Sequence, residues 1–132
     1  MLVDTDIVSF FYKKDTRAKA YEQHLTGQTL FISFITVAEL YRWPFERNWG
    51  EKKKQDLVQY LKNYTVLPYD DALAWTWAEL VGKTTRDRPI ALHDSWIAAT
   101  ALRHKLPLVT HNRKHFEHIP GLTLVSENRE DA

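Results

Sequence analysis

The sequence predicts a single α/β domain with a mostly parallel sheet of about five strands flanked by helices. Short apolar runs of strand type alternate with longer segments of helical spacing along the whole chain, which is the order of parallel βαβ units. A hydrophobic content of 44% with only 4 glycines and 5 prolines is typical of a packed core. The 132 residues contain no internal repeat or linker, so 1–132 is expected to form one domain, with 126–132 as a flexible tail.

The composition excludes several classes of protein. The absence of cysteine rules out a disulfide framework and a thiolate metal site. No charge-free apolar run approaches the roughly 18 residues of a membrane span, and Asp4 and Asp6 interrupt any signal-peptide core. We therefore expect a cytoplasmic protein. With 18 basic and 17 acidic residues the net charge is +1, so any nucleic-acid binding must come from local charge clusters.

Strand and helix signals can be followed in order through the first half of the chain. An apolar start that turns acidic at Asp4 predicts a buried strand, and Gly27 is expected to end the second helix. Pro44 is expected to break or kink the third helix, because it lacks a backbone N–H. The expected elements are a strand at 1–4, helices at 7–12 and 15–25, a strand at 30–33 and a helix at 33–43.

The second half continues the alternation. The basic run at 52–54 is interpreted as solvated surface. In the long helix after Asp70, helical spacing is expected to turn Ala74, Trp77, Ala78 and Val81 toward the core. The tryptophans Trp75, Trp77 and Trp96 are expected to be core or half-buried packing. The expected elements are helices at 51–63 and 70–82, a helix that starts at Asp94, and strands at 65–67, 107–110 and 122–125.

Three carboxylates recur at equivalent places. Asp4 ends the first strand, Glu39 lies on the helix after the second, and Asp94 opens the helix before the fourth. Ligands of open α/β sheets bind beyond the carboxyl ends of the strands. Acids beside apolar sequence are costly unless they are paired or bind a cation, and all-oxygen ligands favour Mg²⁺ or Mn²⁺ over zinc. Such an ion can activate water and polarise a phosphoryl oxygen, which suggests phosphodiester hydrolysis. The other interpretation of Asp4 or Asp6 is a helix N-cap.

Four stretches resemble the successive motifs of PIN domains, and in particular of VapC-type toxins. In order along the chain they are LVDTDIVS at 2–9, ISFITVAEL at 32–40, HDSWIAATA at 93–101 and LVTHNRKHF at 108–116. The resemblance covers nearly the whole chain. It implies a Mg²⁺-dependent (or Mn²⁺-dependent) endoribonuclease that leaves 5′-phosphate and 3′-hydroxyl ends, and an antitoxin protein as partner.

The resemblance also implies roles for individual residues. Asp4, Glu39 and Asp94 match the family's three most regular acids: Asp4 and Asp94 as principal metal ligands, and Glu39 holding a second ion or orienting the nucleophile. Where many members carry a fourth acid, this chain has Asn112, which can still coordinate through its carbonyl or hold a water. Asp6 either supplies the missing charge or only caps a helix. Thr110 matches the motif threonine and either orients an acid or fills the core.

Other residues are candidates for contacts with RNA or protein. Arg113 and Lys114 are expected to bind substrate phosphates, and Arg86 and Arg88 could reach the same groove. By contrast, His104 and Lys105 are interpreted as a plain helix end. The aromatic residues are too many for one core, so part of them is expected to form an exposed interface for an antitoxin helix or a homodimer, namely Phe10, Phe11, Tyr12 and Trp43.

Three alternatives remain open at this point. The Asp4-Thr5-Asp6 run also resembles the nucleophile motif of haloacid-dehalogenase-type phosphatases, but no late lysine and paired-aspartate motif follows. A signalling receiver also gathers aspartates around Mg²⁺, yet Pro68 and Tyr69 stand where its phosphoacceptor is expected. The third alternative is a PIN fold that binds RNA or protein without catalysis, for which Asn112 is the only support.

Overall fold

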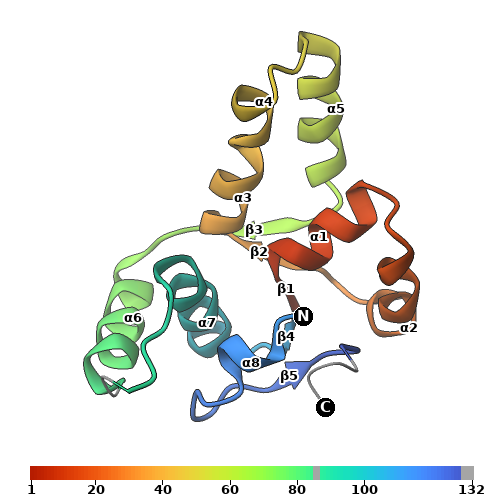
Figure 1. Cartoon of the computed structure of the whole chain (residues 1–132). Helices are drawn as coiled ribbons and strands as arrows, with labels where there is room; N and C mark the ends of the chain where they lie inside the picture. The colour runs from red at the N-terminus through yellow and green to blue at the C-terminus, as the bar shows by residue number, and fades with distance from the viewer. Residues whose placement is uncertain (85–86, 129–132) are drawn as a thin grey trace.

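The predicted parallel sheet is confirmed. The structure, a computed structural model, describes residues 1–84 and 87–128. Its strands are β1 (Leu2–Val3), β2 (Phe31–Ser33), β3 (Thr65–Leu67), β4 (Leu108–Val109) and β5 (Leu124–Val125). They form one sheet in the order β3-β2-β1-β4-β5, and every neighbouring pair is parallel. The first strand of the chain therefore lies in the centre of the sheet (Figure 1).

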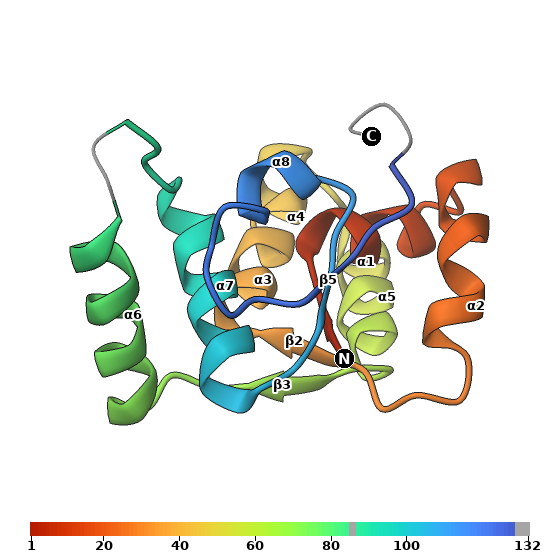
Figure 2. The ribbon, with the colours of Figure 1, turned by 90° about the horizontal axis from the view of Figure 1, so that it is seen from below.

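Helical segments connect the strands and cover the sheet. The sheet separates two hydrophobic clusters: Val3 and Val109 pack with α1 and α5, whereas Leu2 and Leu108 pack with α7 and Phe116. This division follows from the alternation of side chains along a strand. Figure 2 shows α6 at one edge of the molecule and α2 at the other. The helical segments are α1 (Thr5–Tyr12), η1 (Thr16–Tyr21), α2 (Glu22–Leu25), α3 (Phe34–Tyr41), α4 (Trp43–Glu46), α5 (Glu51–Leu61), α6 (Asp71–Lys83), α7 (Leu92–His104) and α8 (Arg113–Phe116).

Several boundaries differ from the predictions. The segment expected as one helix at 15–25 begins as the 3₁₀ helix η1 and becomes α-helical only at Glu22. Pro44 lies in the first turn of α4, where a missing N–H costs nothing, so it opens a short helix after α3 has ended at Tyr41. Helix α7 starts at Leu92, which places Asp94 inside its first turn.

The predicted core face of α6 was wrong in part. Ala78 and Val81 are exposed, and Trp75 is 73% exposed, while Leu73 is fully buried. The reason is the edge position of α6, which packs mainly on α7. Trp77 and Trp96 stack on each other with ring centroids 4.7 Å apart, so these two are half-buried as expected.

The end of the chain is tied to the body by hydrogen bonds. The Glu127 N–H donates to the Tyr21 hydroxyl, and the Asn128 side chain donates to the His111 carbonyl. Glu127 and Asn128, at the start of the expected tail, thus contact the body of the domain, and 129–132 lie outside the described residues. In residues 1–84 and 87–128, no helix has the length and apolar character needed to cross a membrane.

Candidate active site

Asp4 is held rigidly at the carboxyl end of β1. Its side chain is 96% buried, since only 4% of the residue is exposed. One carboxylate oxygen accepts from the Thr5 N–H at 2.7 Å, and the other accepts from the Thr110 hydroxyl at 2.7 Å. Burial raises the pKa of Asp4 well above its ordinary value, and the nearby charge of Asp6 adds to the rise. The centre of the sheet thus carries a carboxylate that a bound cation would stabilise.

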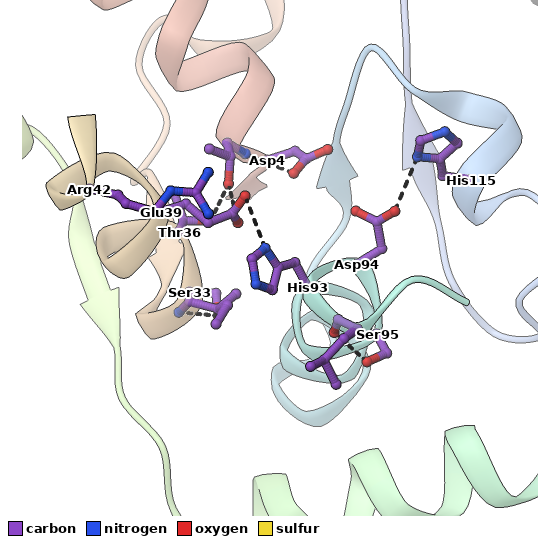
Figure 3. Close-up of polar contacts among 12 residues, drawn as sticks. Asp4, Ser33, Thr36, Glu39, Arg42, His93, Asp94, Ser95 and His115 are labelled. Carbon is purple, nitrogen blue, oxygen red and sulfur yellow. Dashed lines mark hydrogen bonds and ion pairs between the residues drawn. The ribbon is translucent and has the colours of Figure 1, made fainter. Parts of the chain in front are cut away.

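Glu39 reaches the same place from α3. Its Oε1 accepts from the Thr5 hydroxyl at 3.0 Å, and that hydroxyl also lies 2.9 Å from the Thr36 hydroxyl. On the other side, Oε2 lies 3.5 Å from Nδ1 of His93, as Figure 3 shows. Thr5 therefore links the residue after Asp4 to Glu39, so the two acids are positioned together.

Asp94 approaches from the first turn of α7. Its Oδ2 lies 3.1 Å from Nδ1 of His115, whose side chain is 57% exposed (Figure 3). Partial burial raises the pKa of Asp94, and the neighbouring His115 and His93 oppose that rise. Asp94 consequently has a solvent-exposed partner, unlike Asp4.

Asp6 and Asn112 lie beside these acids. The Asp6 carboxylate accepts from the Ile7 N–H at 2.7 Å and from the His111 N–H at 3.0 Å, and burial raises its pKa. The Asn112 N–H donates to the Thr110 hydroxyl at 3.0 Å. Both contacts fix the loop after β4, so Asp6 has a structural use whether or not it binds a cation.

All these acids converge on one cavity of about 270 Å³. Its walls contain Asp4, Thr5, Asp6, Ser9, Glu39, Trp43, Asp94, Ile97 and Asn112. In the described part of the chain, Glu39 and Asp94 each pair with a histidine, and no ion pair reaches Asp4 or Asp6. An excess of carboxylate oxygens around one open space is the environment that a divalent cation neutralises.

The donor set fits Mg²⁺ in its chemistry. Within residues 1–84 and 87–128, no three His, Cys, Asp or Glu side chains lie close enough together to enclose one ion as they stand. Mg²⁺ does not need such a cage, because it keeps several waters and is held through one or two carboxylates. Asp4, Glu39 and Asp94, with Asn112 as a neutral oxygen donor, are the residues that could hold it.

Sequence reasoning missed several residues of the site. His93 and His115 were not among the predicted site residues, yet each lies against an acid. Tyr21 was not singled out, although it is fully buried and its hydroxyl lies 2.6 Å from Nδ1 of His111. The position of His93 directly before Asp94 was the available signal. Tyr21 offered none, since 90 residues separate it from His111.

The predicted substrate residues do not share one location. Lys114 and Arg88 line a second cavity that also borders Asp94. Arg113 instead donates to the Ser126 carbonyl at 3.2 Å, which ties it to the end of the chain. Arg86 lies outside the described residues. The last turn of α7, with Arg103 and His104, is at the opposite end of that helix from Asp94.

The structure contradicts the expected exposed face at Phe10 and leaves Phe11, Tyr12 and Trp43 half-buried. Phe10 is only 7% exposed, and Phe11, Tyr12 and Trp43 are partly buried against the core cluster. Tyr12 lies against Trp43, Trp49 and Tyr60. The α4–α5 hairpin supplied the packing partners that the sequence could not reveal. Phe45 of α4, in contrast, is 73% exposed.

Comparisons with known proteins agree with this geometry. The PIN domain family matches residues 1–122. Ribonuclease VapC1 of Rickettsia felis is 30% identical over 135 residues, which cover 99% of this chain and 98% of the relative. Ribonuclease VapC1 of Haemophilus influenzae strain R2866 is 31% identical over 126 residues, 92% of each chain. The solved structure of VapBC-1 from nontypeable Haemophilus influenzae has a TM-score of 0.78 at 26% identity, covering 95% of this chain and 96% of that one.

Proposed function

This chain belongs to the PIN domain family, and from that premise we propose that it is a metal-dependent endoribonuclease acting as the toxin of a toxin–antitoxin pair. The observation that carries the proposal is the single cavity shared by Asp4, Glu39 and Asp94. Its relatives are named ribonucleases, and the matching solved structure is of a VapBC protein. The phosphatase and receiver alternatives lose their support with the family assignment.

The chain's own residues would prepare the reaction in three ways. The Thr5 N–H and the Thr110 hydroxyl hold both oxygens of Asp4, which fixes the direction of their remaining lone pairs. The Thr5 hydroxyl holds Glu39, the residue we assign to a second ion or to orientation of the attacking water. Asp94 closes the cavity from α7. A bound Mg²⁺ or Mn²⁺ supplies a water of lowered pKa and polarises a phosphoryl oxygen. We propose 5′-phosphate and 3′-hydroxyl products.

The test is cleavage of a structured RNA pool by the purified protein, with mapping of the product ends. Mg²⁺ or Mn²⁺ should support cleavage and EDTA should stop it. Asp4→Asn and Asp94→Asn should each lower the rate by at least about 100-fold, since each removes a ligand charge. Asp56→Asn is the matched control, because Asp56 lies exposed on α5 outside the cavity. A 2′,3′-cyclic phosphate product, or equal activity in all variants, would contradict the proposal.

The non-catalytic alternative predicts a different result. A folded, metal-loaded protein that binds RNA without cutting it would favour a PIN-fold binding module. Folding of each variant is checked by thermal unfolding, so that loss of structure is not mistaken for loss of chemistry.

We place the antitoxin on the exposed face of the α3–α5 arm. Tyr41 is 42% exposed and Phe45 is 73% exposed, and both line an apolar cavity of about 280 Å³ with Pro44, Lys54, Leu57 and Val58. Such a groove suits the apolar side of an amphipathic segment. α4 and the far end of α5 project away from the sheet in Figure 1, so a partner can reach this arm.

Phe45→Ala should weaken antitoxin binding by about tenfold, the loss typical of a buried aromatic contact at an interface. Because the ring is exposed in the free chain, thermal stability and RNA cleavage should stay unchanged. Calorimetric titration with the cognate antitoxin measures the effect, and Lys52→Ala serves as an exposed control on the same arm. Unaltered affinity would mean that the antitoxin binds another surface.

We also propose that the protein is a homodimer and acts in the cytoplasm. Sedimentation of the free toxin tests the oligomeric state.

A further inference from the structure

Two more cavities lie next to one another beside the active-site cavity. The second, of about 360 Å³, has Asp94 in its wall, as the active-site cavity does. The third, of about 620 Å³, shares Arg88, Ile90 and His118 with the second. The three cavities are therefore neighbours, and shared wall residues connect the acids to the space between α6, α7 and the segment after α8.

The chemistry of the walls changes from the second cavity to the third. The second cavity carries charges of both signs, with Arg88 and Lys114 beside Asp87 and Asp94, and two histidines, His115 and His118. The third is mainly apolar, and the single acid in its wall, Glu79, is paired with Lys83 at 2.9 Å. The apolar side chains are Leu80, Ile90, Leu102, Ile119 and Pro120.

A histidine ring lies where the second and third cavities meet. His118 Nε2 is buried and has no hydrogen-bond partner in the described part of the chain. His118 borders both the second and the third cavity. A buried ring nitrogen that lacks a partner is rare and costly, and a ligand with hydrogen-bonding edges would satisfy it.

We propose that these two cavities form a nucleotide subsite, in which Arg88 binds a backbone phosphate and the third cavity takes the nucleobase. A mainly apolar space with polar groups in its wall suits a base, which has two apolar faces and a hydrogen-bonding edge. The Arg88 guanidinium, which lines both cavities, suits the phosphate that joins this base to the scissile bond. The subsite rests on the proposed ribonuclease function and adds to it a residue-level site for a neighbouring nucleotide.

The subsite can be tested by binding alone. The probes are 5′-AMP, ribose 5-phosphate and inorganic phosphate, titrated calorimetrically into the full chain in the presence of Mg²⁺. 5′-AMP should bind about tenfold more tightly than ribose 5-phosphate, a ratio typical of one buried or stacked base. Thr76, on α6, lines the third cavity and its hydroxyl only donates to the Ala72 carbonyl of the same helix.

Variants separate the two parts of the subsite. Thr76→Phe fills the cavity and should remove the advantage of 5′-AMP while leaving ribose 5-phosphate unchanged; Thr76→Ser keeps the space and is the matched control. Arg88→Gln should weaken all phosphate probes together, by about tenfold. His118→Phe retains a ring without the nitrogen and should lower affinity for 5′-AMP only. It provides a second test if Thr76→Phe fails to fold.

The outcomes distinguish this inference from the function it rests on. Equal affinity for 5′-AMP and ribose 5-phosphate, or an unaltered preference in Thr76→Phe and His118→Phe, would overturn the subsite even if the protein cleaves RNA. Loss of antitoxin binding in Thr76→Phe without an effect on 5′-AMP would also overturn it, by assigning the cavity to the protein partner. A nucleotide preference in a protein that never cleaves RNA would keep the subsite and remove the ribonuclease.

Discussion

The inner and outer halves of the acidic cavity are held by different means. In the inner half, buried hydrogen bonds from Thr5 and Thr110 engage both oxygens of Asp4. In the outer half, Asp94 relies on His115, whose side chain is 57% exposed, and Glu39 combines the Thr5 hydroxyl with His93, which is 44% exposed. Buried charge-assisted hydrogen bonds are worth more than exposed ion pairs, which water screens.

This difference indicates that the inner half of the site is already fixed before a cation or substrate binds, whereas the outer half is not. The inner acid has a fixed direction, while the outer acids can exchange a histidine for another partner at low cost. It also accounts for the absence of a closed three-ligand cluster among the described residues. Four changes to single residues test the comparison.

The largest effect is expected for Thr110→Val. It removes the donor to Asp4 and the acceptor of the Asn112 N–H while preserving the shape of the side chain. We expect a loss of about 2 kcal/mol in the free energy of unfolding, typical of a buried hydrogen bond to a charged group. Denaturant unfolding measures it, with Thr110→Ser as the control that keeps the hydroxyl. A loss below about 0.5 kcal/mol would mean that the inner half is not rigidly held.

Asn112→Asp adds a charge at the border between the two halves. Asn112 lines the cavity with Asp4 and Asp94, so a carboxylate there should tighten Mn²⁺ binding by about tenfold. Calorimetric titration of Mn²⁺ gives the affinity, and Asn63→Asp, an exposed site after α5, is the control. If affinity does not change, missing charge is not what limits the second metal position.

The stability of the metal-free protein should depend on pH through the buried acids. The pKa of Asp4 is raised above its ordinary 3.8, so above that pH the folded state binds more protons than the unfolded state. The free energy of unfolding should therefore fall as pH rises from about 4 toward neutrality. Asp4→Asn should make this decline shallower and Asp56→Asn should not. An identical slope in Asp4→Asn and the parent chain would assign the dependence to other groups.

The smallest effect is expected for His115→Ala in the outer half. Because the His115 side chain is largely exposed, the free energy of unfolding should change by no more than about 0.5 kcal/mol. The rate of RNA cleavage should fall much less than in Asp94→Asn. Chemical denaturation and the cleavage assay measure the two effects. A stability loss comparable to that of Thr110→Val would remove the distinction between the halves.

The sequence predicted those features that depend on local pattern. Alternating apolar runs predicted the parallel sheet, and the positions of Asp4, Glu39 and Asp94 relative to strand ends predicted a shared edge. The sequence alone could not predict features that depend on packing between segments far apart in the chain. The burial of Phe10 and the exposure of Trp75 depend on which helices lie at the margin of the sheet. The hydrogen bonds of Tyr21 depend on two segments that the fold alone brings together.

The central position of β1 has a consequence for the synthesis of this protein. β1 lies between β2 and β4, and the Thr110 hydroxyl that holds Asp4 comes 106 residues later in the chain. At about 5–20 residues per second, a ribosome needs roughly 5–20 s to make that stretch. During this interval the growing chain carries its first acid beside an unpaired strand edge. The inner half of the cavity therefore assembles only after Thr110 has been made, and a chain truncated before Thr110 lacks it.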